Sequence, residues 1–423
     1  MMGGDLVVTN IGTLVTPVGP APRRGSELGA VREVARAAIV AAAGRIAYAG
    51  AEARMPADVI PARAARLDAG GAAVVPGFVD AHTHLAYAGD RDAEIRQRLA
   101  GRSYAEIAAQ GGGIVRTVAA TRAASAAELE ALLVGRLDEM LRCGTTTAEV
   151  KSGYGLETSA EIRSLEAIRG AGARHPITLV PTFLGAHEVP LEHRARRERY
   201  VDLLVGEMIP AVAARRLAAF ADVFCEQGVF TVAESRRILE ASRAAGLGLR
   251  LHADELAWTG GAELAGEMGT RSADHLLFVS QDGISALARA GCAATLLPAA
   301  AFYLRLGRHA PARALVEGGV PVALATDGNP GGGLSPSMPF AMAVACFAMG
   351  LSLEEALTAA TLNAAYSVGL EAETGSVEAG KRADFVVLRS ARLLDLLRVG
   401  VPAVRAVVKD GRVVVRDGLR GSG

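Results

Sequence analysis

Eight short, continuously apolar segments alternate with helical or loop segments through the central part of the chain. Continuous apolar runs are typical of parallel strands that are covered on both faces. The runs end near His84, Lys151, His187, Glu226, His252, His275, Pro298 and Asp327. Eight parallel strands separated by helices predict an α/β fold, a TIM-like (β/α)8 barrel. Such barrels carry their chemistry at the carboxyl ends of the strands.

Four Ser/Thr-x-x-Glu patterns indicate where helices between the strands begin. They are Ser125 with Glu128, Thr158 with Glu161, Thr231 with Glu234, and Ser352 with Glu355. In such a capping box the hydroxyl accepts a hydrogen bond from the backbone amide of the glutamate, and the glutamate carboxylate accepts one in return. Each pattern therefore predicts a helix that starts at its first residue.

Both ends of the chain consist of short β-type runs separated by Gly and Pro. These runs cover residues 5–8, 38–40, 45–50, 384–388, 404–408 and 412–415. Strands this short need partners to bury a face. The pattern predicts one small β-sandwich built from residues 1–72 and 371–423, with the barrel between them at residues 73–370. Two separate flaps remain the alternative.

Composition narrows the classes of partner. Acidic and basic residues balance at 45 each, which favours a small molecule over nucleic acid or a membrane surface. No apolar run has the length that a bilayer requires. The four cysteines are far apart, and the amino terminus lacks a secretion signal core. A cytoplasmic protein with reduced thiols is expected.

Histidines concentrate at the predicted strand ends. The apolar run from Val74 leads through a Pro-Gly step into His82 and His84, which share one face of an extended segment. His252 ends the fifth strand, and Asp327 ends the eighth, which lies beside the first in a closed barrel. Three imidazoles and a carboxylate suit zinc or iron better than magnesium or calcium. For the His-x-His pair alone, two polar residues at a strand end remain the alternative.

These features resemble the amidohydrolase superfamily and, within it, the imidazolonepropionase family. The resemblance extends over nearly the whole chain. Its most specific segments are residues 76–84, 88–91, 110–114, 151–156, 185–190, 252–255, 272–276 and 327–331.

The resemblance implies a metal-dependent hydrolase of histidine degradation that opens 4-imidazolone-5-propanoate to N-formimidoyl-L-glutamate. It implies one zinc or iron ion per chain, held by His82, His84, His252 and Asp327. Superfamily members with two metals usually carry a carboxylated lysine on the fourth strand, and this chain has none there. A single ion is therefore expected. Lys151, after the second strand, is interpreted as an ion-pair or lid residue.

The resemblance also implies catalytic roles. A metal-activated hydroxide would attack the cyclic amide carbonyl while Asp327 accepts a proton. His275 would share that task or steady the developing oxyanion. Glu255 would bind the ring nitrogens and donate a proton to the leaving nitrogen, or else orient His252 from behind.

Substrate contacts follow from the same resemblance. Arg91 would bind the propionate carboxylate in a bidentate manner, unless it is a surface charge like its neighbours Arg96, Arg98 and Arg102. The other implied contacts are Tyr104, Tyr154, His187, Glu255, Asn329, Gly331 and Gly332. The family often has Ser or Thr where this chain has Gly332, so a hydroxyl contact is either missing or supplied elsewhere, for example by Ser335.

Two other functions stay open at this point. A deaminase of an aminated heterocycle would share the metal ligands but not Arg91 or the Lys-Ser-Gly-Tyr-Gly-Leu segment. A non-catalytic binding protein on the same barrel would have lost ligands, and this chain has lost none. For the assembly, a homodimer is expected.

Overall fold

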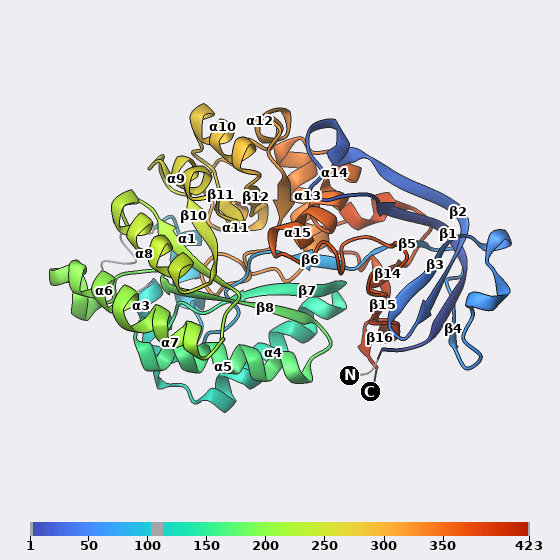
Figure 1. Cartoon of the computed structure of the whole chain (residues 1–423), viewed down its shortest axis with the longest axis horizontal. Coiled ribbons are helices and arrows are strands. Elements are labelled where there is room, and N and C mark those ends of the chain that lie inside the picture. Colours follow the sequence, from blue (N-terminus) through green and yellow to red (C-terminus); the bar gives the residue numbers. More distant parts are fainter. Residues whose placement is uncertain (1–2, 103–112, 422–423) are drawn as a thin grey trace.

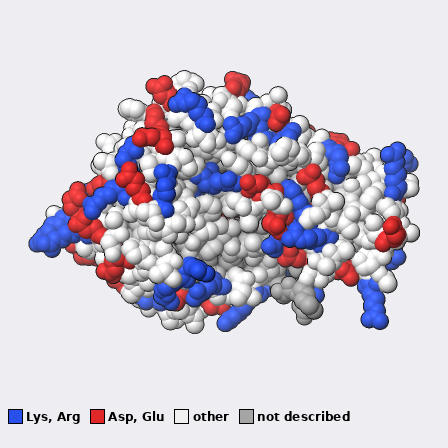
Figure 2. All heavy atoms as spheres, viewed as in Figure 1, with Lys and Arg blue, Asp and Glu red and all other residues white. Residues whose placement is uncertain are grey.

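A computed structural model describes residues 3–102 and 113–421. Figure 1 shows a barrel surrounded by helices and, beside it, a second sheet that contains both ends of the chain. On the face seen in Figure 2, acidic and basic side chains are interspersed. Among the described helices, none is long and apolar enough to cross a membrane.

The eight predicted barrel strands all form. They are β6 (Phe78–Asp80), β7 (Thr145–Lys151), β8 (Thr178–Ala186), β9 (Phe220–Cys225), β10 (Gly248–Ala253), β11 (Ser272–His275), β12 (Ala293–Leu296) and β13 (Val322–Leu324). Each strand is parallel to the next in chain order. Between β6 and β13 the backbone closes the circle just beyond the strands, because Asp327 N–H donates to His82 O at 3.1 Å and His84 N–H to Gly328 O at 2.9 Å. The barrel prediction is confirmed.

Helices connect the strands around the outside of the barrel. They are α1 (Asp92–Leu99), α3 (Ile114–Ala123), α4 (Ala126–Arg142), α5 (Thr158–Arg174), α6 (Arg197–Leu203), α7 (Ile209–Ala214), α8 (Val232–Ala244), α9 (Gly261–Met268), α10 (Gln281–Ala290), α11 (Pro298–Tyr303), α12 (Ala312–Glu317), α13 (Met338–Met349), α14 (Leu353–Ala359) and α15 (Leu362–Ser367). The capping boxes at Ser125, Thr231 and Ser352 are confirmed.

The predicted capping box at Thr158 is wrong. Helix α5 has Glu157 at its N-cap, and the Thr158 hydroxyl donates to Glu207 instead. The buried Glu161 carboxylate accepts hydrogen bonds from the backbone amides of Gly153, Gly155 and Leu156. These loop amides compete for the carboxylate that a capping box needs, so Glu161 fixes the loop after β7.

The second sheet joins both ends of the chain. Its strands are β1 (Leu6–Pro17), β2 (Val31–Ala42), β3 (Arg45–Ala51), β4 (Ala65–Asp68), β5 (Ala73–Pro76), β14 (Phe385–Leu388), β15 (Val404–Lys409), β16 (Arg412–Arg416) and β17 (Leu419–Arg420). The strand order is β17-β16-β15-β14-β5-β1-β2-β3, with β4 beside β1. Because β5 pairs with both β1 and β14, the two ends form one structure, and separate flaps are ruled out.

Side chains that alternate between the two faces of these strands divide the hydrophobic core into two clusters. Val74 and Val387 belong to an inner cluster with residues of β1 and β2, whereas Val75 and Val386 belong to the main cluster that continues into the barrel. Side chains of a strand point alternately to its two faces. One face of the sheet therefore encloses the core of the sandwich, and the other packs on the barrel.

The first barrel strand is shorter than the sequence suggested. Residues 73–76, which we expected in the barrel, form β5 of the second sheet, and the barrel begins at Phe78. Gly77 lies between the two, where a β-carbon would come within 2.3 Å of Thr146 Oγ1. Only glycine fits at this passage between the sheets. We retain the division into three segments as a proposal, with its first boundary moved to Gly77.

Candidate metal centre

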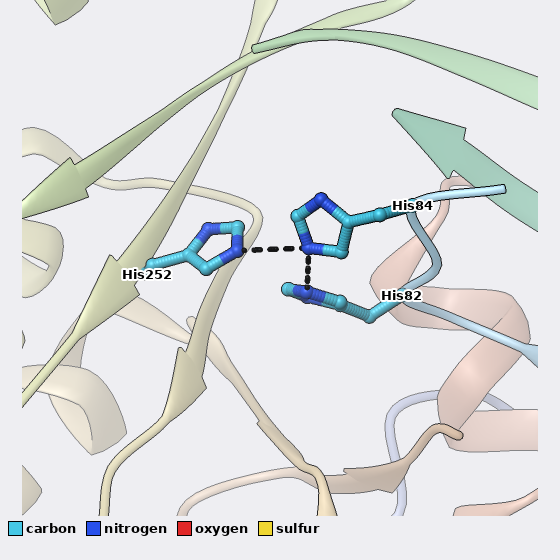
Figure 3. Close-up of side chains that lie close together, drawn as sticks. All are labelled: His82, His84 and His252. Carbon is cyan, nitrogen blue, oxygen red and sulfur yellow. Dashed lines mark hydrogen bonds between the residues drawn. The ribbon is translucent and has the colours of Figure 1, made fainter. Parts of the chain in front are cut away.

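Three histidine side chains converge at the carboxyl ends of the barrel strands (Figure 3). His82 and His84 follow β6, and His252 lies on β10 across the barrel. The Nε2 atom of His84 lies 3.0 Å from Nε2 of His82 and 3.3 Å from Nε2 of His252. Asp327 completes the group, with Oδ1 3.6 Å from His82 Nε2 and 3.5 Å from His84 Nε2.

Two carboxylates lie behind these rings. His82 Nδ1 lies 2.6 Å from Asp274 Oδ2, and His252 Nδ1 lies 3.1 Å from Asp222 Oδ2. On His82 the carboxylate accepts the Nδ1 proton, so Nε2 carries a lone pair. His252 Nδ1 makes no hydrogen bond among the described residues, and Asp222 accepts one from the His252 backbone amide at 3.2 Å. Burial, with smaller contributions from neighbouring cationic groups, lowers the pKa of His82 and His84 well below its usual range. Neutral imidazoles therefore face one another in a buried space.

These residues fit a metal ion. Atoms bound to one zinc at about 2.1 Å lie about 3.4 Å apart, close to the separations among the four side chains. Lone pairs gathered without donors are unfavourable unless a cation lies between them. The donor set of three imidazoles and one carboxylate suits zinc or iron.

The other predicted catalytic groups lie around the same point. The His275 ring lies beside those of His82 and His252, with centroids 5.4 and 5.2 Å away, and its Nδ1 is 3.5 Å from Glu255 Oε1. Burial, followed by the charges of Asp327 and Glu226, raises the pKa of Glu255 well above its usual range. A neutral Glu255 carboxyl can donate a proton or a hydrogen bond.

A cavity of about 520 Å³ opens above this group. Its lining includes the predicted substrate residues Arg91, Tyr154, His187, Glu255, Asn329, Gly331 and Gly332. Tyr104 lies outside the described residues. His187 stacks on His84 with centroids 4.9 Å apart, and burial lowers its pKa to about 3. Its Nδ1 is 3.0 Å from Gly153 O, so the neutral ring donates there and keeps an acceptor at Nε2.

Arg91 is held firmly at the edge of the cavity. Its Nε donates to Glu94 at 2.9 Å, and the other Glu94 oxygen accepts from the Gly113 amide at 2.9 Å. A β-carbon on Gly331 would come within 2.3 Å of Arg91 Nη1, so the glycine makes room for the guanidinium. Only 7% of Arg91 is exposed, which excludes the surface-charge alternative.

The neighbouring arginines differ from expectation. Arg98 and Arg102 also line the cavity, and Arg98 donates to Gly331 O. The interpretation of Arg98 as a surface loop charge is wrong, because this half-buried side chain faces the cavity, whereas Arg102 is exposed as expected although it also borders the cavity. Arg96 is exposed on the opposite side of α1, as expected.

The loop after Asp327 is held by its own side chains. Asn329 Nδ2 donates to Asp327 O at 2.7 Å, and its Oδ1 accepts from the amides of Gly331 and Gly332, both at 2.7 Å. A β-carbon on Gly332 would lie 2.8 Å from Leu304, which explains the glycine where the family often has Ser or Thr. Ser335 is not among the described residues that line the cavity, so it does not supply the hydroxyl there.

Sequence reasoning missed a buried ionic network beneath the histidines. Lys151 Nζ lies 2.8 Å from Glu149 and 2.7 Å from Asp222, and Arg250 Nη2 lies 3.1 Å from Asp274. All five side chains are fully buried. Burial alone would lower the pKa of Lys151, but Asp222 and Glu149 outweigh it and raise that pKa. The ion-pair interpretation of Lys151 is confirmed, and a lid contact is excluded.

One signal could have revealed this network. Three charged residues interrupt the apolar runs of the strands, namely Glu149, Lys151 and Arg250. Glu149 lies two positions before Lys151, and Arg250 lies two positions before His252, so the side chains of each pair share one face of their strand. Charged residues at inward-facing positions of a strand are almost never buried unless they are paired. Their presence in these runs therefore indicates partners across the barrel.

A (β/α)8 barrel with three buried imidazoles and a carboxylate at the carboxyl ends of its strands is typical of metal-dependent hydrolases. A family model described as "Amidohydrolase family" matches residues 90–415. An imidazolonepropionase of Symbiobacterium thermophilum is 52% identical over 417 residues, covering 98% of each chain. Another, of Alkaliphilus metalliredigens, is 43% identical over 416 residues, covering 98% of this chain and 99% of the relative. The chain therefore belongs to the imidazolonepropionase family of amidohydrolases.

Solved structures share the fold at low sequence identity. An adenosine deaminase from Xanthomonas campestris with bound zinc has a TM-score of 0.72 and 19% identity, covering 99% of this chain and 95% of that chain. Guanine deaminase of E. coli has a TM-score of 0.70 and 18% identity, covering 97% of this chain and 99% of that chain. The deaminase alternative is supported only by this likeness of fold.

Proposed function

We propose that this protein hydrolyses 4-imidazolone-5-propanoate to N-formimidoyl-L-glutamate. The observation that carries the proposal is the cavity itself, whose lining includes His84, His252, Asp327 and the buried Arg91, with His82 beside them in the histidine cluster. The test is incubation of the purified protein with imidazolone propionate made freshly from urocanate, followed by loss of the ring chromophore. Turnover of an aminated heterocycle without turnover of the imidazolone would support a deaminase instead.

The chain's own groups divide the work of hydrolysis. A metal ion bound by His82, His84, His252 and Asp327 would act as a Lewis acid and lower the pKa of water. Asp327 would accept the proton of the attacking water, since its carboxylate borders both the ligands and the cavity.

The remaining groups act on the ring and on its tail. His275 would steady the developing oxyanion or share the proton with Asp327. Glu255, 3.5 Å from His275 and kept neutral by burial, would donate a proton to the departing ring nitrogen. Arg91 would bind the propionate carboxylate through its guanidinium nitrogens. His187 and Tyr154 would form the wall against which the ring lies.

We expect about one equivalent of zinc or iron per chain in the purified protein. Chelation should remove the metal and the activity together, and adding back either ion should restore both. Elemental analysis alongside a rate measurement checks this. Two tightly held equivalents, or full activity without metal, would contradict a mononuclear site.

We also propose a homodimer in the cytoplasm. Helix α13 supports the dimer, because it contains no charged residue and leaves Phe347 80% exposed. Aromatic side chains are enriched at interfaces between subunits. Light scattering that gives the mass of one chain would contradict the dimer. The four free cysteines agree with a reducing compartment, and cell fractionation would test the location.

A further inference from the structure

The loop after β7, residues 152–157, carries Tyr154 into the wall of the cavity, and we call it the Tyr154 loop. Tyr154 is only 3% exposed, and its ring centroid lies 5.2 Å from that of His187. The carbonyl oxygen of Gly153, the residue before it, lies 3.0 Å from His187 Nδ1. Two side chains of the cavity wall therefore depend on the backbone of one short loop.

The Tyr154 loop adopts a backbone conformation that its own sequence only partly favours. Gly153 and Leu156 both have positive φ angles, of 108° and 51°. Glycine tolerates such an angle, but leucine rarely adopts it, because its β-carbon then approaches a backbone carbonyl oxygen. Contacts from outside the loop are needed to keep this shape.

One carboxylate, that of Glu161 in the first turn of α5, accepts hydrogen bonds from three amides of the loop. The Gly153 amide donates to Oε2 at 3.0 Å, and the amides of Gly155 and Leu156 donate to Oε1 at 2.7 and 2.9 Å. Glu161 is fully buried, and a β-carbon on Gly155 would come within 2.6 Å of its amide nitrogen. Amides on both sides of Tyr154 thus end on one carboxylate, which holds the tyrosine backbone at two points.

One guanidinium binds the carbonyl groups of the same loop. Arg122, on α3, donates from Nε to Gly155 O at 2.6 Å and from Nη2 to Leu156 O at 3.1 Å. Its Nη2 also donates at 2.8 Å to Glu192, in the segment after β8. Arg122 therefore joins the connections that follow β6, β7 and β8. Neither Arg122 nor Glu161 is among the described residues that line the cavity, so both act on it through the loop.

We propose that Glu161 and Arg122 are positioning residues for the substrate ring. Glu161 binds the amides of the Tyr154 loop and Arg122 binds its carbonyls. Together they place the Tyr154 side chain and the Gly153 carbonyl at the wall against which the ring lies. This inference rests on the proposed function, because it assigns both residues to the binding of that substrate.

The arrangement of the loop can be tested in the unaltered, full-length protein. Hydrogen–deuterium exchange resolved to single residues should show the amides of Gly153, Gly155 and Leu156 exchanging as slowly as those of β7, although they lie in a loop. Rapid exchange of these three amides would show that the carboxylate does not hold the loop and would overturn the proposal. The measurement requires neither a variant nor a substrate.

Variants of Glu161 should give a graded loss of activity. Glu161→Gln keeps one oxygen for Gly155 and Leu156 but turns an amide group toward the Gly153 amide, so that two donors face each other. Glu161→Ala removes all three contacts. We expect kcat/KM for the imidazolone to fall about 10-fold with the first and about 100-fold with the second, since a displacement of about 1 Å costs on this scale.

The kinetic parameters separate positioning from other roles. Contacts that hold the ring are made in the ground state as well as in the transition state, so their loss should raise KM more than it lowers kcat. Arg122→Met, which removes both carbonyl contacts, should act in the same direction. Steady-state rates on folded, metal-loaded variants measure this. Unchanged kinetics, or a loss confined to kcat, would overturn the proposal.

A double-mutant cycle tests whether Glu161 acts through the loop. In a Tyr154→Ala background, Glu161→Ala should cost much less than it does alone, because the side chain that it places is already missing. Losses in kcat/KM that multiply in full would show that Glu161 does not act through the Tyr154 loop.

A buried carboxylate in the second sheet provides the matched control. Asp384 accepts the Asp410 amide at 2.9 Å and is 2% exposed. Asp384→Asn should lower the unfolding temperature, as Glu161→Gln does, but leave kcat and KM unchanged. Equal kinetic losses in the two variants would show that Glu161 serves stability alone. Absence of turnover by the unaltered protein would reject the proposed function, whereas turnover that the Glu161 variants retain in full would reject the positioning role alone.

Discussion

Replacement of Asp327 by asparagine is expected to lower turnover of the imidazolone at least about 100-fold, the scale of general-base removal. Asparagine nearly matches aspartate in shape, but its amide cannot accept a proton from water. The backbone contact from Asp327 N–H to His82 O does not involve the side chain, so the fold should persist. Steady-state rates on metal-loaded protein measure the effect.

The control for this experiment is Asp202→Asn. Asp202 is 61% exposed on α6, where it pairs with Arg237. Its removal should leave turnover within error of the unaltered protein. Near-normal turnover by a metal-loaded Asp327→Asn variant would reject Asp327 as the base and leave His275 as the candidate.

Replacement of Arg91 by methionine is expected to reduce kcat/KM by about 30-fold to several thousand-fold. The estimate corresponds to about 2–5 kcal/mol for truncating one partner of a buried, hydrogen-bonded charge pair. The loss should depend on the substrate tail. An imidazolone analogue without the carboxylate should be poor with the unaltered protein and little worse with the variant, because the interaction is missing already.

Arg96→Met provides the matched control, since Arg96 lies on α1, directly after Arg91, but is exposed to solvent. It should leave both substrates almost unaffected. Equal losses on both substrates for Arg91→Met would show that the arginine supports the loop with Glu94 and does not bind the carboxylate. The substrate assignment would then rest on the family relationship alone.

Much of the candidate metal centre could be predicted from local patterns in the sequence. Continuous apolar runs identified all eight barrel strands, and their ends placed His82, His84, His252 and Asp327 at one mouth. The prediction succeeded because the burial of a strand shows in its own consecutive apolar residues. The carboxyl ends of all barrel strands also lie on the same face of the barrel, so a strand end predicts where its side chains lie. Local patterns do not predict that residues 73–76 pair with β14, because this strand pairing depends on a partner far along the chain.

The sequence by itself therefore determined the fold class, the expected ligands of one ion and the family to which the chain belongs. The tertiary structure decided which charges support those ligands. Lys151 meets Asp222 across 71 positions, and His82 meets Asp274 across 192. No local pattern encodes such pairs. They exist because barrel closure brings inward-facing side chains of separate strands into one buried space, where each charge must find a partner.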